Sequence, residues 1–511
     1  MDKQGGRVTL PKIRDTYDRG QFEECLALCP RFGPADAQEV VELALLQARC
    51  LISLGRGAQA IDVLSSRRVG SDLNDYELLR RTLVAAAYLS LNQDDRALTA
   101  VQSAYDERTE ADPIVQAEIS VYLGIAHYRK GELQRAERLL EAVPPDADIV
   151  YAHALLYRGY AAWRRGNFAG SVDRFRDALR CVDACKRRDR FVEARCIHAL
   201  AFLCADLLLL HLWGEISERI RRFDWQASGV SRWRYYIAIA GSFVSEILGD
   251  LEASTRWAEL AEEIAPDPLL QIQAWCRMAA RFGRNGESGA HDHFARKALG
   301  KYNDLAAAND VRIARFPALA LDIADEILET REPRAATPLL TYFREVALPT
   351  MRGSSDDRNN LANYSMCIGR YEEQRGNRAR AEEAYLQAFQ TNKATGLRRR
   401  ATIAAYRLLV LTGDIQYEAF IAEALSAASE RYWLKAKLTR TRTEAHLSKR
   451  HLAILPLVAM GMTNKEIGAV RGRSELTARN TVREAIAILG VRNRAELVSV
   501  AAQRGLLKPA N

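Results

Sequence analysis

The side chains best suited to chemistry lie near the C-terminus and are of the types that contact nucleic acid. Arg479 and Arg483 are four residues apart with Asn480 between them, so a helix would display all three on one side. Arginine forms paired hydrogen bonds with guanine, and asparagine does so with adenine, at their major-groove edges. Three preceding cations are suited to hold phosphates: Lys465, Arg471 and Arg473. This pattern predicts a helix that enters the major groove of duplex DNA.

The charge of the chain is concentrated in the same region. The 511 residues carry 73 Lys and Arg against 65 Asp and Glu, a net charge of +8. Residues 447–511 contain eleven Lys or Arg and four Glu, a net charge of +7, and residues 435–446 add +3. Residues 1–434 are therefore close to neutral, at −2. A basic tip favours a polyanionic partner, although a solvated surface explains the charge alone equally well.

Two short helices are predicted before the DNA-reading helix. An apolar stripe over residues 452–459 predicts the first, which ends at Gly461. Thr463 and Glu466 have the spacing of a capping box, in which each side chain accepts a hydrogen bond from the other residue's backbone amide. On the short second helix two residues are expected to face inward, Ile467 and Val470.

Two longer helices are predicted after this pair. Gly472 supplies the turn, and Ser474 is suited to cap a third helix that runs to Leu489. Asn493 and Glu496 have the spacing of another N-terminal cap. The fourth helix that follows carries an apolar set: Leu497, Val500 and Ala501.

These motifs resemble the LuxR-type helix-turn-helix family over residues 447–507. The resemblance is carried by Leu447-Ser-Lys-Arg, Gly461-Met-Thr-Asn-Lys-Glu-Ile, Ser474-x-x-Thr, Leu489-Gly-Val-x-x-Arg and Gly505-Leu-Leu. It implies a four-helix DNA-binding domain in which Arg479, Asn480 and Arg483 lie on the DNA-contacting face. The full set of predicted DNA-binding residues is Thr463, Asn464, Lys465, Arg471, Arg473, Ser474, Thr477, Arg479, Asn480 and Arg483. It also implies that the fourth helix pairs two domains through Leu497, Val500 and Ala501.

Some positions depart from the family pattern. Arg471 and Arg473 stand where apolar residues are usual, so either both point to solvent or the turn is remodelled, with Val470 in the buried place. Pro456 removes one backbone hydrogen bond and implies a kink in the first helix. Other family positions hold smaller or altered side chains: His451, Ala478, Thr481 and Ala485. The two alanines predict a thinner core, and the DNA-binding prediction stands.

The rest of the chain repeats one pattern about every 35–39 residues. A small residue, a Gly or Asn, a small residue and a bulky residue recur at fixed spacing, as in Gly159, Gly166, Ser171 and Phe175. The Gly or Asn ends a helix in the left-handed conformation, and the small residues let two helices approach. The expected turn residues are Gly20, Gly55, Asn92, Gly131, Gly166, Gly214, Gly249, Asn285, Gly376 and Gly413. The pattern predicts about eleven antiparallel helix pairs, with one degenerate unit near Arg331.

These units resemble the tetratricopeptide repeat (TPR), over roughly residues 10–430. The resemblance implies an α-solenoid whose concave groove binds a protein or peptide, or a second copy of the chain. One interruption, residues 223–241, contains four aromatic residues: Trp225, Trp233, Tyr235 and Tyr236. They either form a partner-recognition pocket or pack an irregular joint between repeats.

Other classes of function find no support in the sequence. No G-x-x-x-x-G-K-[ST] loop and no Ser/His/Asp or Cys/His arrangement stands out, so we expect neither an enzyme nor a cofactor. His291 and His293 flank an Asp, a spacing that favours a surface stretch over a metal site. Scattered cysteines, no signal peptide and no apolar run long enough for a membrane predict a cytoplasmic, nucleoid-associated protein.

The sequence therefore predicts an all-α chain of three parts. These are a TPR-like helical-repeat domain (1–434), a basic linker (435–446) and a LuxR-type helix-turn-helix domain (447–511). The leading hypothesis is a dimeric transcription regulator that reads promoter DNA through its tip and binds a partner through its solenoid. The alternative is a protein-interaction adaptor whose tip contacts a protein such as RNA polymerase. A sigma-type factor is a third interpretation, which the repeats upstream weaken.

Overall fold

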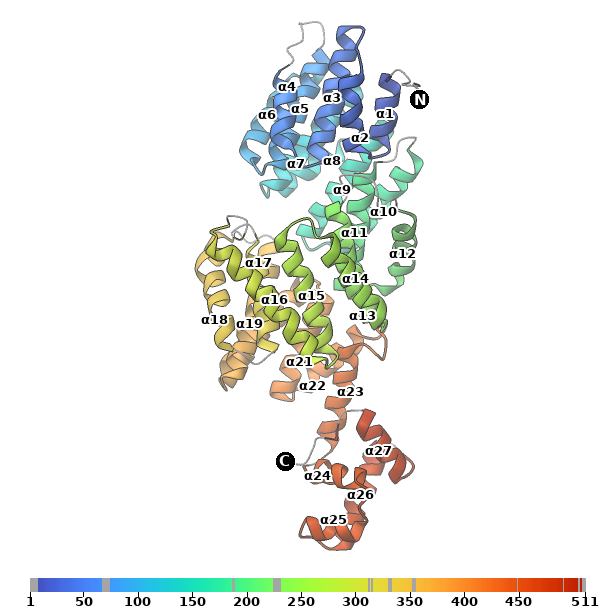
Figure 1. Ribbon diagram of the computed structural model, residues 1–511, viewed down its shortest axis with the longest axis vertical. Coiled ribbons are helices and arrows are strands. Elements are labelled where there is room, and N and C mark those ends of the chain that lie inside the picture. Colours follow the sequence, from blue (N-terminus) through green and yellow to red (C-terminus); the bar gives the residue numbers. More distant parts are fainter. Residues whose placement is uncertain are drawn as a thin grey trace, which may run out of the picture.

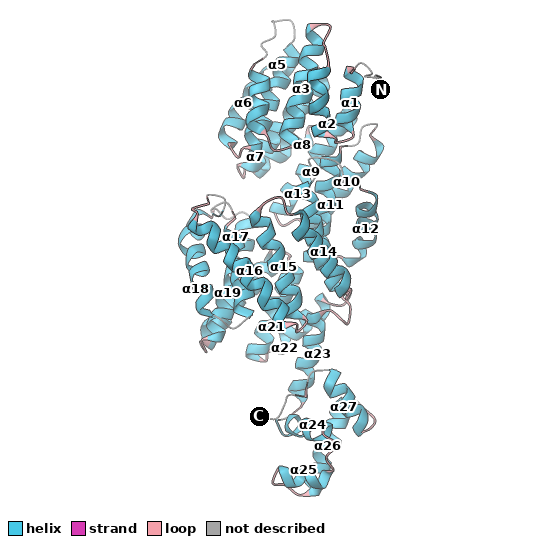
Figure 2. Ribbon diagram, in the orientation of Figure 1, coloured by secondary structure: helices cyan, strands magenta, loops and turns pink. Residues whose placement is uncertain are grey.

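The computed structural model describes residues 8–66, 74–185, 189–223, 231–310, 313, 316–329, 333–351, 355–447, 449–489, 491–503 and 506–507. Over these residues the chain contains twenty-seven α-helices and no strand (Figure 2). None of these helices is both long and apolar enough to cross a bilayer. The predicted all-α class is confirmed.

Helices α1 to α22 pair in order into eleven antiparallel hairpins, the number that the repeat predicts (Figure 1). The first six pairs are α1 (Leu10–Asp18) with α2 (Phe22–Leu28), α3 (Ala37–Ser53) with α4 (Gly57–Ser65), α5 (Asn74–Ser90) with α6 (Asp94–Glu107), α7 (Pro113–Arg129) with α8 (Leu133–Glu141), α9 (Ile149–Arg164) with α10 (Phe168–Ala184), and α11 (Arg190–Leu207) with α12 (Trp213–Arg222).

The other five pairs are α13 (Ser231–Ile247) with α14 (Leu251–Ile264), α15 (Pro268–Arg284) with α16 (Ser288–Ala307), α17 (Pro317–Glu329) with α18 (Pro333–Tyr342), α19 (Ser355–Gln374) with α20 (Arg378–Ala394), and α21 (Arg398–Thr412) with α22 (Ile415–Ala424). The pair α17–α18 is the unit expected near Arg331, which itself lies outside the described residues. Five helices follow: α23 (Trp433–His446), α24 (Lys449–Ala459), α25 (Asn464–Val470), α26 (Glu475–Leu489) and α27 (Arg494–Gln503).

Most hairpins turn at a residue in the left-handed conformation, as predicted. Eight of the ten expected turn residues have φ between 57° and 82°: Gly20, Gly55, Asn92, Gly131, Gly166, Gly249, Gly376 and Gly413. The other two predictions are wrong, because Gly214 lies inside α12 and Gly286 rather than Asn285 makes the turn after α15. Before α12 the left-handed residue is Leu208, with φ 59°. Its side chain is buried, so tertiary packing rather than local preference holds this conformation.

The small residues of the repeat let the two helices of a pair touch. A Cβ added to Gly159 of α9 would lie 2.6 Å from Phe175 of α10, and one added to Gly369 of α19 would lie 2.4 Å from Tyr385 of α20. Both rings are fully buried. The spacing seen in the sequence therefore marks the contact between paired helices.

The superhelix closes on itself where α21 returns to contact α11. Asp206 of α11 accepts hydrogen bonds from Arg399 of α21, at 3.0 Å from Nε and 2.6 Å from Nη2. The two side chains are only 6% and 9% exposed. Helices α9 and α19 also meet. These contacts enclose part of the concave side of the repeats.

The aromatic residues near the start of α13 pack a joint between repeats. Tyr235 is fully buried, and its hydroxyl donates to a backbone carbonyl of α15 at 2.7 Å. The half-buried rings of Trp233 and Tyr236 lie 5.5 Å and 5.2 Å from the His198 ring of α11. Trp225 lies outside the described residues. The expected role in partner recognition is therefore wrong for Tyr235, because no partner reaches a side chain without exposed surface.

His291 is also buried, although its neighbours suggested a surface stretch. Its ring fills the space left by the missing side chain of Gly283, and Nε2 lies 3.3 Å from a carboxylate oxygen of Glu326. His293, two residues on, is exposed because it lies on another face of the helix. Over the part of the chain that the structure describes, no three His, Cys, Asp or Glu side chains gather as a metal site.

The expected basic linker is a helix, α23, rather than an irregular segment. Its first turns are anchored in the solenoid core by Leu434 and Leu438, which are 0% and 3% exposed. The guanidinium of Arg284 stacks on Trp433, 5.3 Å from the ring centroid. Two leucines four residues apart supply the apolar stripe that the polar composition obscures. Helix α23 then contacts α26, so it joins the repeats directly to the tip.

Candidate nucleic-acid interface

Helices α24 to α27 form a small domain around its own apolar core. Leu455 of α24, Ile467 of α25, Leu489 of α26 and Leu497 of α27 are each at most 5% exposed and lie in one cluster. Every helix of the tip therefore contributes to one core, as expected for a four-helix domain.

The second helix of this domain starts at the predicted capping box. The Thr463 hydroxyl accepts a hydrogen bond from the Glu466 amide at 3.3 Å, and a Glu466 carboxylate oxygen accepts one from the Thr463 amide at 2.6 Å. The hydrogen bonds from the Thr463 amide and hydroxyl lower the pKa of Glu466. This arrangement fixes the start of α25 and the loop before it.

The turn between α25 and α26 depends on a glycine that sequence reasoning missed. Gly468 is buried, and a Cβ on it would lie 2.8 Å from the Arg473 carbonyl oxygen. The absence of a side chain lets α25 approach the turn and the start of α26. Gly472 takes φ 59° in this turn, as predicted. The signal for Gly468 was its place beside the inward-facing Ile467.

Helix α26 has one buried and one exposed face. Ala478, Val482 and Ala485 pack into the core, while Arg479, Asn480 and Arg483 are exposed. The exposed three share one side of the helix, as the sequence predicted. Arg479 forms an exposed ion pair with Glu475 at 3.2 Å, a contact of at most about 1 kcal/mol that a nucleic-acid group can replace.

The other expected DNA contacts surround the start of α26. Ser474 caps this helix by accepting from the Thr477 amide at 3.2 Å. The expected residues of this group that are exposed are Thr463, Lys465, Arg471, Arg473, Ser474 and Thr477. Asn464 is half-buried, and its side-chain oxygen accepts a hydrogen bond from Arg494 of α27 at 3.1 Å. Asn464 therefore also has a structural contact, whereas the other six line an open surface.

Arg471 and Arg473, which depart from the family pattern, point to solvent, so the turn does not bury a charge. The accompanying expectation that Val470 faces inward is wrong, since Val470 is 59% exposed. Helix α25 is seven residues long and ends at Val470, beyond its contact with the core at Ile467 and Gly468.

The residues expected to pair two domains are mostly part of the core. Leu497 and Ala501 have no exposed surface, and only Val500 is half-exposed. The dimerisation role expected of Leu497 and Ala501 therefore conflicts with their burial. On α27, these two residues lie four apart on the side that faces α24 and α26.

The remaining departures are accommodated inside the domain. His451 is buried, and its Nε2 lies 2.8 Å from Glu484 of α26, which also pairs with Arg450 at 2.6 Å. The hydrogen bond with His451 and the charge of Arg450 lower the pKa of Glu484. The buried hydroxyl of Thr481 donates to the Thr477 carbonyl at 2.8 Å. Helix α24 continues past Pro456.

The tip matches a known family of domains. Residues 445–501 match the GerE model, described as "Bacterial regulatory proteins, luxR family". This segment is a LuxR-type helix-turn-helix domain. Such a domain indicates a DNA-binding regulator, and the solenoid before it indicates protein interaction. No curated protein matches the sequence of the chain.

The chain is similar in part to several solved helical proteins. The apo form of RapI is 14% identical over 69% of this chain and 98% of its own, with a TM-score of 0.48. A human IFIT1 dimer with m7Gppp-AAAA is 16% identical over 85% and 95%, with a TM-score of 0.44. The Cut9–Hcn1 hetero-tetramer of APC/C is 12% identical over 81% and 95%, with a TM-score of 0.24. The repeat assignment rests on the eleven hairpins themselves.

Proposed function

We propose that the chain is a transcription regulator in which α26 of the LuxR-type domain enters the major groove of promoter DNA. The observation that carries this proposal is the two-faced character of α26. Its buried face fixes the helix on the domain, while Arg479, Asn480 and Arg483 extend from the opposite face. Arginine and asparagine in this position pair with guanine and adenine edges.

The surrounding polar surface supplies contacts to the DNA backbone. Lys465, Arg471 and Arg473 add three exposed cations beside α26, and the hydroxyls of Thr463, Ser474 and Thr477 add hydrogen-bonding groups. Contacts of this kind position a domain on the duplex without reading sequence. Binding through them is expected to weaken steeply with salt, because each neutralised phosphate releases counterions.

The solenoid is the surface for a second partner, a protein or peptide or another copy of the chain. Because Leu497 and Ala501 are buried, a homodimer would form through the repeats or through the remaining exposed surface of α27. A regulator of this kind acts in the cytoplasm, on the nucleoid.

An adaptor that contacts RNA polymerase is the second candidate. It is favoured by two exposed apolar side chains beside the basic surface, Val470 at 59% and Leu476 at 60%. Apolar residues flanked by arginines are typical of protein interfaces.

The deciding experiment measures where and how tightly the full-length chain binds DNA. Sequencing of cross-linked chromosomal fragments identifies the bound sites, and fluorescence anisotropy on those duplexes gives affinity as a function of salt. The double variant Arg479→Ala/Arg483→Ala is expected to lose at least about 100-fold in affinity for these sites. Arg492→Ala is the matched control, since it removes an 88% exposed charge from the same domain outside the proposed interface.

The control variant is expected to keep nearly all of its affinity. Equal binding by the wild type and the double variant would refute the groove assignment for α26. If no duplex is bound at any salt concentration and Leu476→Ser abolishes capture of RNA polymerase, the adaptor is the correct function.

A further inference from the structure

The closed part of the solenoid contains a cavity of about 450 Å³. Its walls come from α9 and from helices between α11 and α21, and the Asp206–Arg399 contact joins α11 to α21. A volume of this size is typical of sites for small molecules rather than for folded partners. The cavity is separate from the LuxR-type domain.

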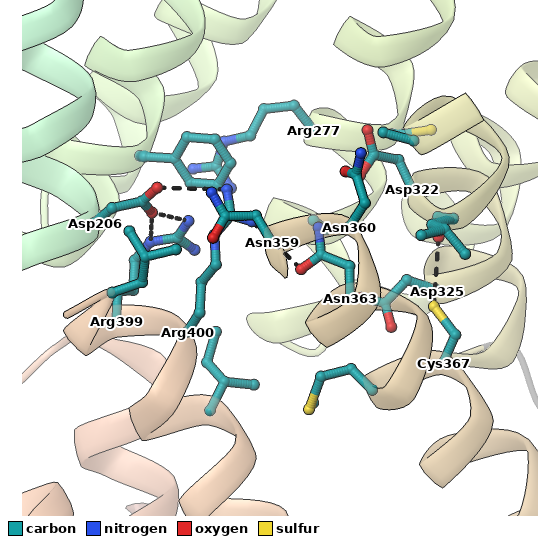
Figure 3. A pocket seen from close by; sticks show the side chains of 18 of the residues that line it. Asp206, Arg277, Asp322, Asp325, Asn359, Asn360, Asn363, Cys367, Arg399 and Arg400 are labelled. Atoms are coloured by element: carbon teal, nitrogen blue, oxygen red, sulfur yellow. Dashed lines mark hydrogen bonds and ion pairs between the residues drawn. The ribbon is translucent and has the colours of Figure 1, made fainter. Parts of the chain in front are cut away.

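One wall of the cavity is basic and retains hydrogen-bonding capacity (Figure 3). Arg277 is 3% exposed; its Nη2 pairs with Glu246 at 2.6 Å and its Nε donates to Ser242 at 2.9 Å, but its Nη1 has no hydrogen-bond partner. Arg400 donates to Asp206 and Asn363 only across long distances of 3.4 Å each. Each of these two guanidinium groups can therefore donate a further hydrogen bond to an anionic ligand.

The opposite wall is acidic (Figure 3). Asp325 is paired with Arg370 at 3.2 Å, whereas Asp322 makes no ion pair with any described residue. Burial raises the pKa of Asp322 to about 7, with a contribution from the charges of Asp325 and Glu326 and an opposing one from Arg400. A cation placed next to such a buried carboxylate stabilises its ionised form.

Side-chain amides occupy the space between the two walls. Figure 3 shows Asn359, Asn360 and Asn363 between Arg400 and the aspartates. The Asn359 side-chain oxygen is buried without a partner. Asn392, which also lines the cavity, is 1% exposed, and neither its oxygen nor its nitrogen has a hydrogen-bond partner. Buried amides of this kind are normally satisfied, so these atoms point to a polar occupant.

We propose that this cavity binds a small zwitterion, an amino acid or a peptide of two or three residues. Its carboxylate would meet Arg277 and Arg400, and its ammonium group would meet Asp322. One wall presents cations and the other a carboxylate, so a ligand with a single charge would leave one of the two walls without a partner. The buried amides supply donors and acceptors for the peptide or side-chain groups of the ligand. This inference does not depend on DNA binding.

The test uses the full-length chain and measures its thermal unfolding and its heat of binding. The probes are the twenty amino acids and a pool of random di- and tripeptides, each at about 10 mM, a concentration that reveals even millimolar affinity. A bound zwitterion is expected to raise Tm progressively with the logarithm of its concentration. Binding of amino acids or of peptides alone identifies which of the two is the source. N-acetylated and C-amidated forms of the active probe, which lack one charge, are expected not to bind.

Two variants make the test specific to this cavity. Asp322→Asn is expected to weaken binding about 10- to 100-fold, because it removes a charge-assisted contact to the ammonium group. Asn392→Leu is expected to abolish binding while raising the Tm of the ligand-free chain, since it replaces an unsatisfied amide with an apolar group of similar size. Asp173→Asn, on the exposed face of α10, is the matched control.

Three results would overturn the proposal. One is the absence of a Tm shift with every zwitterion in the panel, and another is equal binding of the capped forms. The third is unchanged affinity in Asp322→Asn. None of these measurements involves DNA, so they stand apart from the outcome of the promoter-binding experiment.

Discussion

Removing the charge of Asp206 is expected to destabilise the solenoid by about 3–5 kcal/mol. Asp206 joins α11 to α21 across 193 residues of sequence and is buried against Arg399. Although burial disfavours its ionisation, Arg400 and Arg399 outweigh that effect and lower the pKa of Asp206. Asp206→Asn keeps the size of the side chain but leaves a buried guanidinium without its counter-charge.

The chain offers a matched control for this change. Asp183 and Arg219 are also 2.6 Å apart, but their side chains are 42% and 21% exposed. Breaking an exposed pair costs at most about 1 kcal/mol, so Asp183→Asn is expected to be nearly silent. Urea unfolding followed by circular dichroism at neutral pH compares the two variants. Hydrogen exchange in α11 and α21 then locates the loss.

A second comparison separates charge from packing. The double variant Asp206→Leu/Arg399→Met replaces the ion pair with apolar side chains and is expected to recover most of the lost stability. The reasoning fails if Asp206→Asn costs no more than Asp183→Asn. It also fails if the double variant is no more stable than Asp206→Asn, since the loss would then not come from an uncompensated charge.

Three further predictions concern other parts of the chain. Gly369→Ala is expected to lower the free energy of unfolding in urea by about 1–3 kcal/mol, because the added methyl group clashes with Tyr385. Gly300→Ala, whose Cβ would lie in open space on α16, is expected to raise it by about 0.4–1 kcal/mol. Equal effects of the two variants would refute the contact. Asp322→Asn should be more stable than the wild type by up to about 4 kcal/mol at pH 8. Its carboxyl pKa is raised in the folded chain to about 7, so this advantage should disappear as the pH falls to about 4, and a pH-independent difference would contradict it. Thr463→Ala should lower the free energy of unfolding by about 0.5–2 kcal/mol and speed hydrogen exchange at the start of α25. Unchanged exchange there would argue against the cap.

Local features of the sequence predicted much of the fold and of the DNA-binding surface. Gly131 and Gly166 end helices because of their own backbone freedom, and Thr463 caps α25 through a neighbour three residues away. Exposure of Arg479 and Arg483 follows from helical spacing alone. Features of this kind are determined within one or two turns of helix, so they can be recognised in the sequence.

The features that the sequence did not reveal depend on contacts between distant residues. Leu208 takes the left-handed conformation because of surrounding packing, although nothing in its own chemistry favours it. The pairing of Asp206 with Arg399 joins two repeats far apart in sequence, and the cavity beside them exists only after that closure. Val470 was misplaced because the length of α25 sets which residues reach the core.

Helix α23 makes the orientation of the DNA-reading surface depend on the last repeats. Its fourteen residues span about 21 Å, and Leu434 and Leu438 hold one end in the solenoid. At that length a tilt of about 10° moves the far end by about 4 Å, which is close to the rise of one base pair. A small change in the curvature of the superhelix would therefore displace α26 by about the spacing between two base pairs.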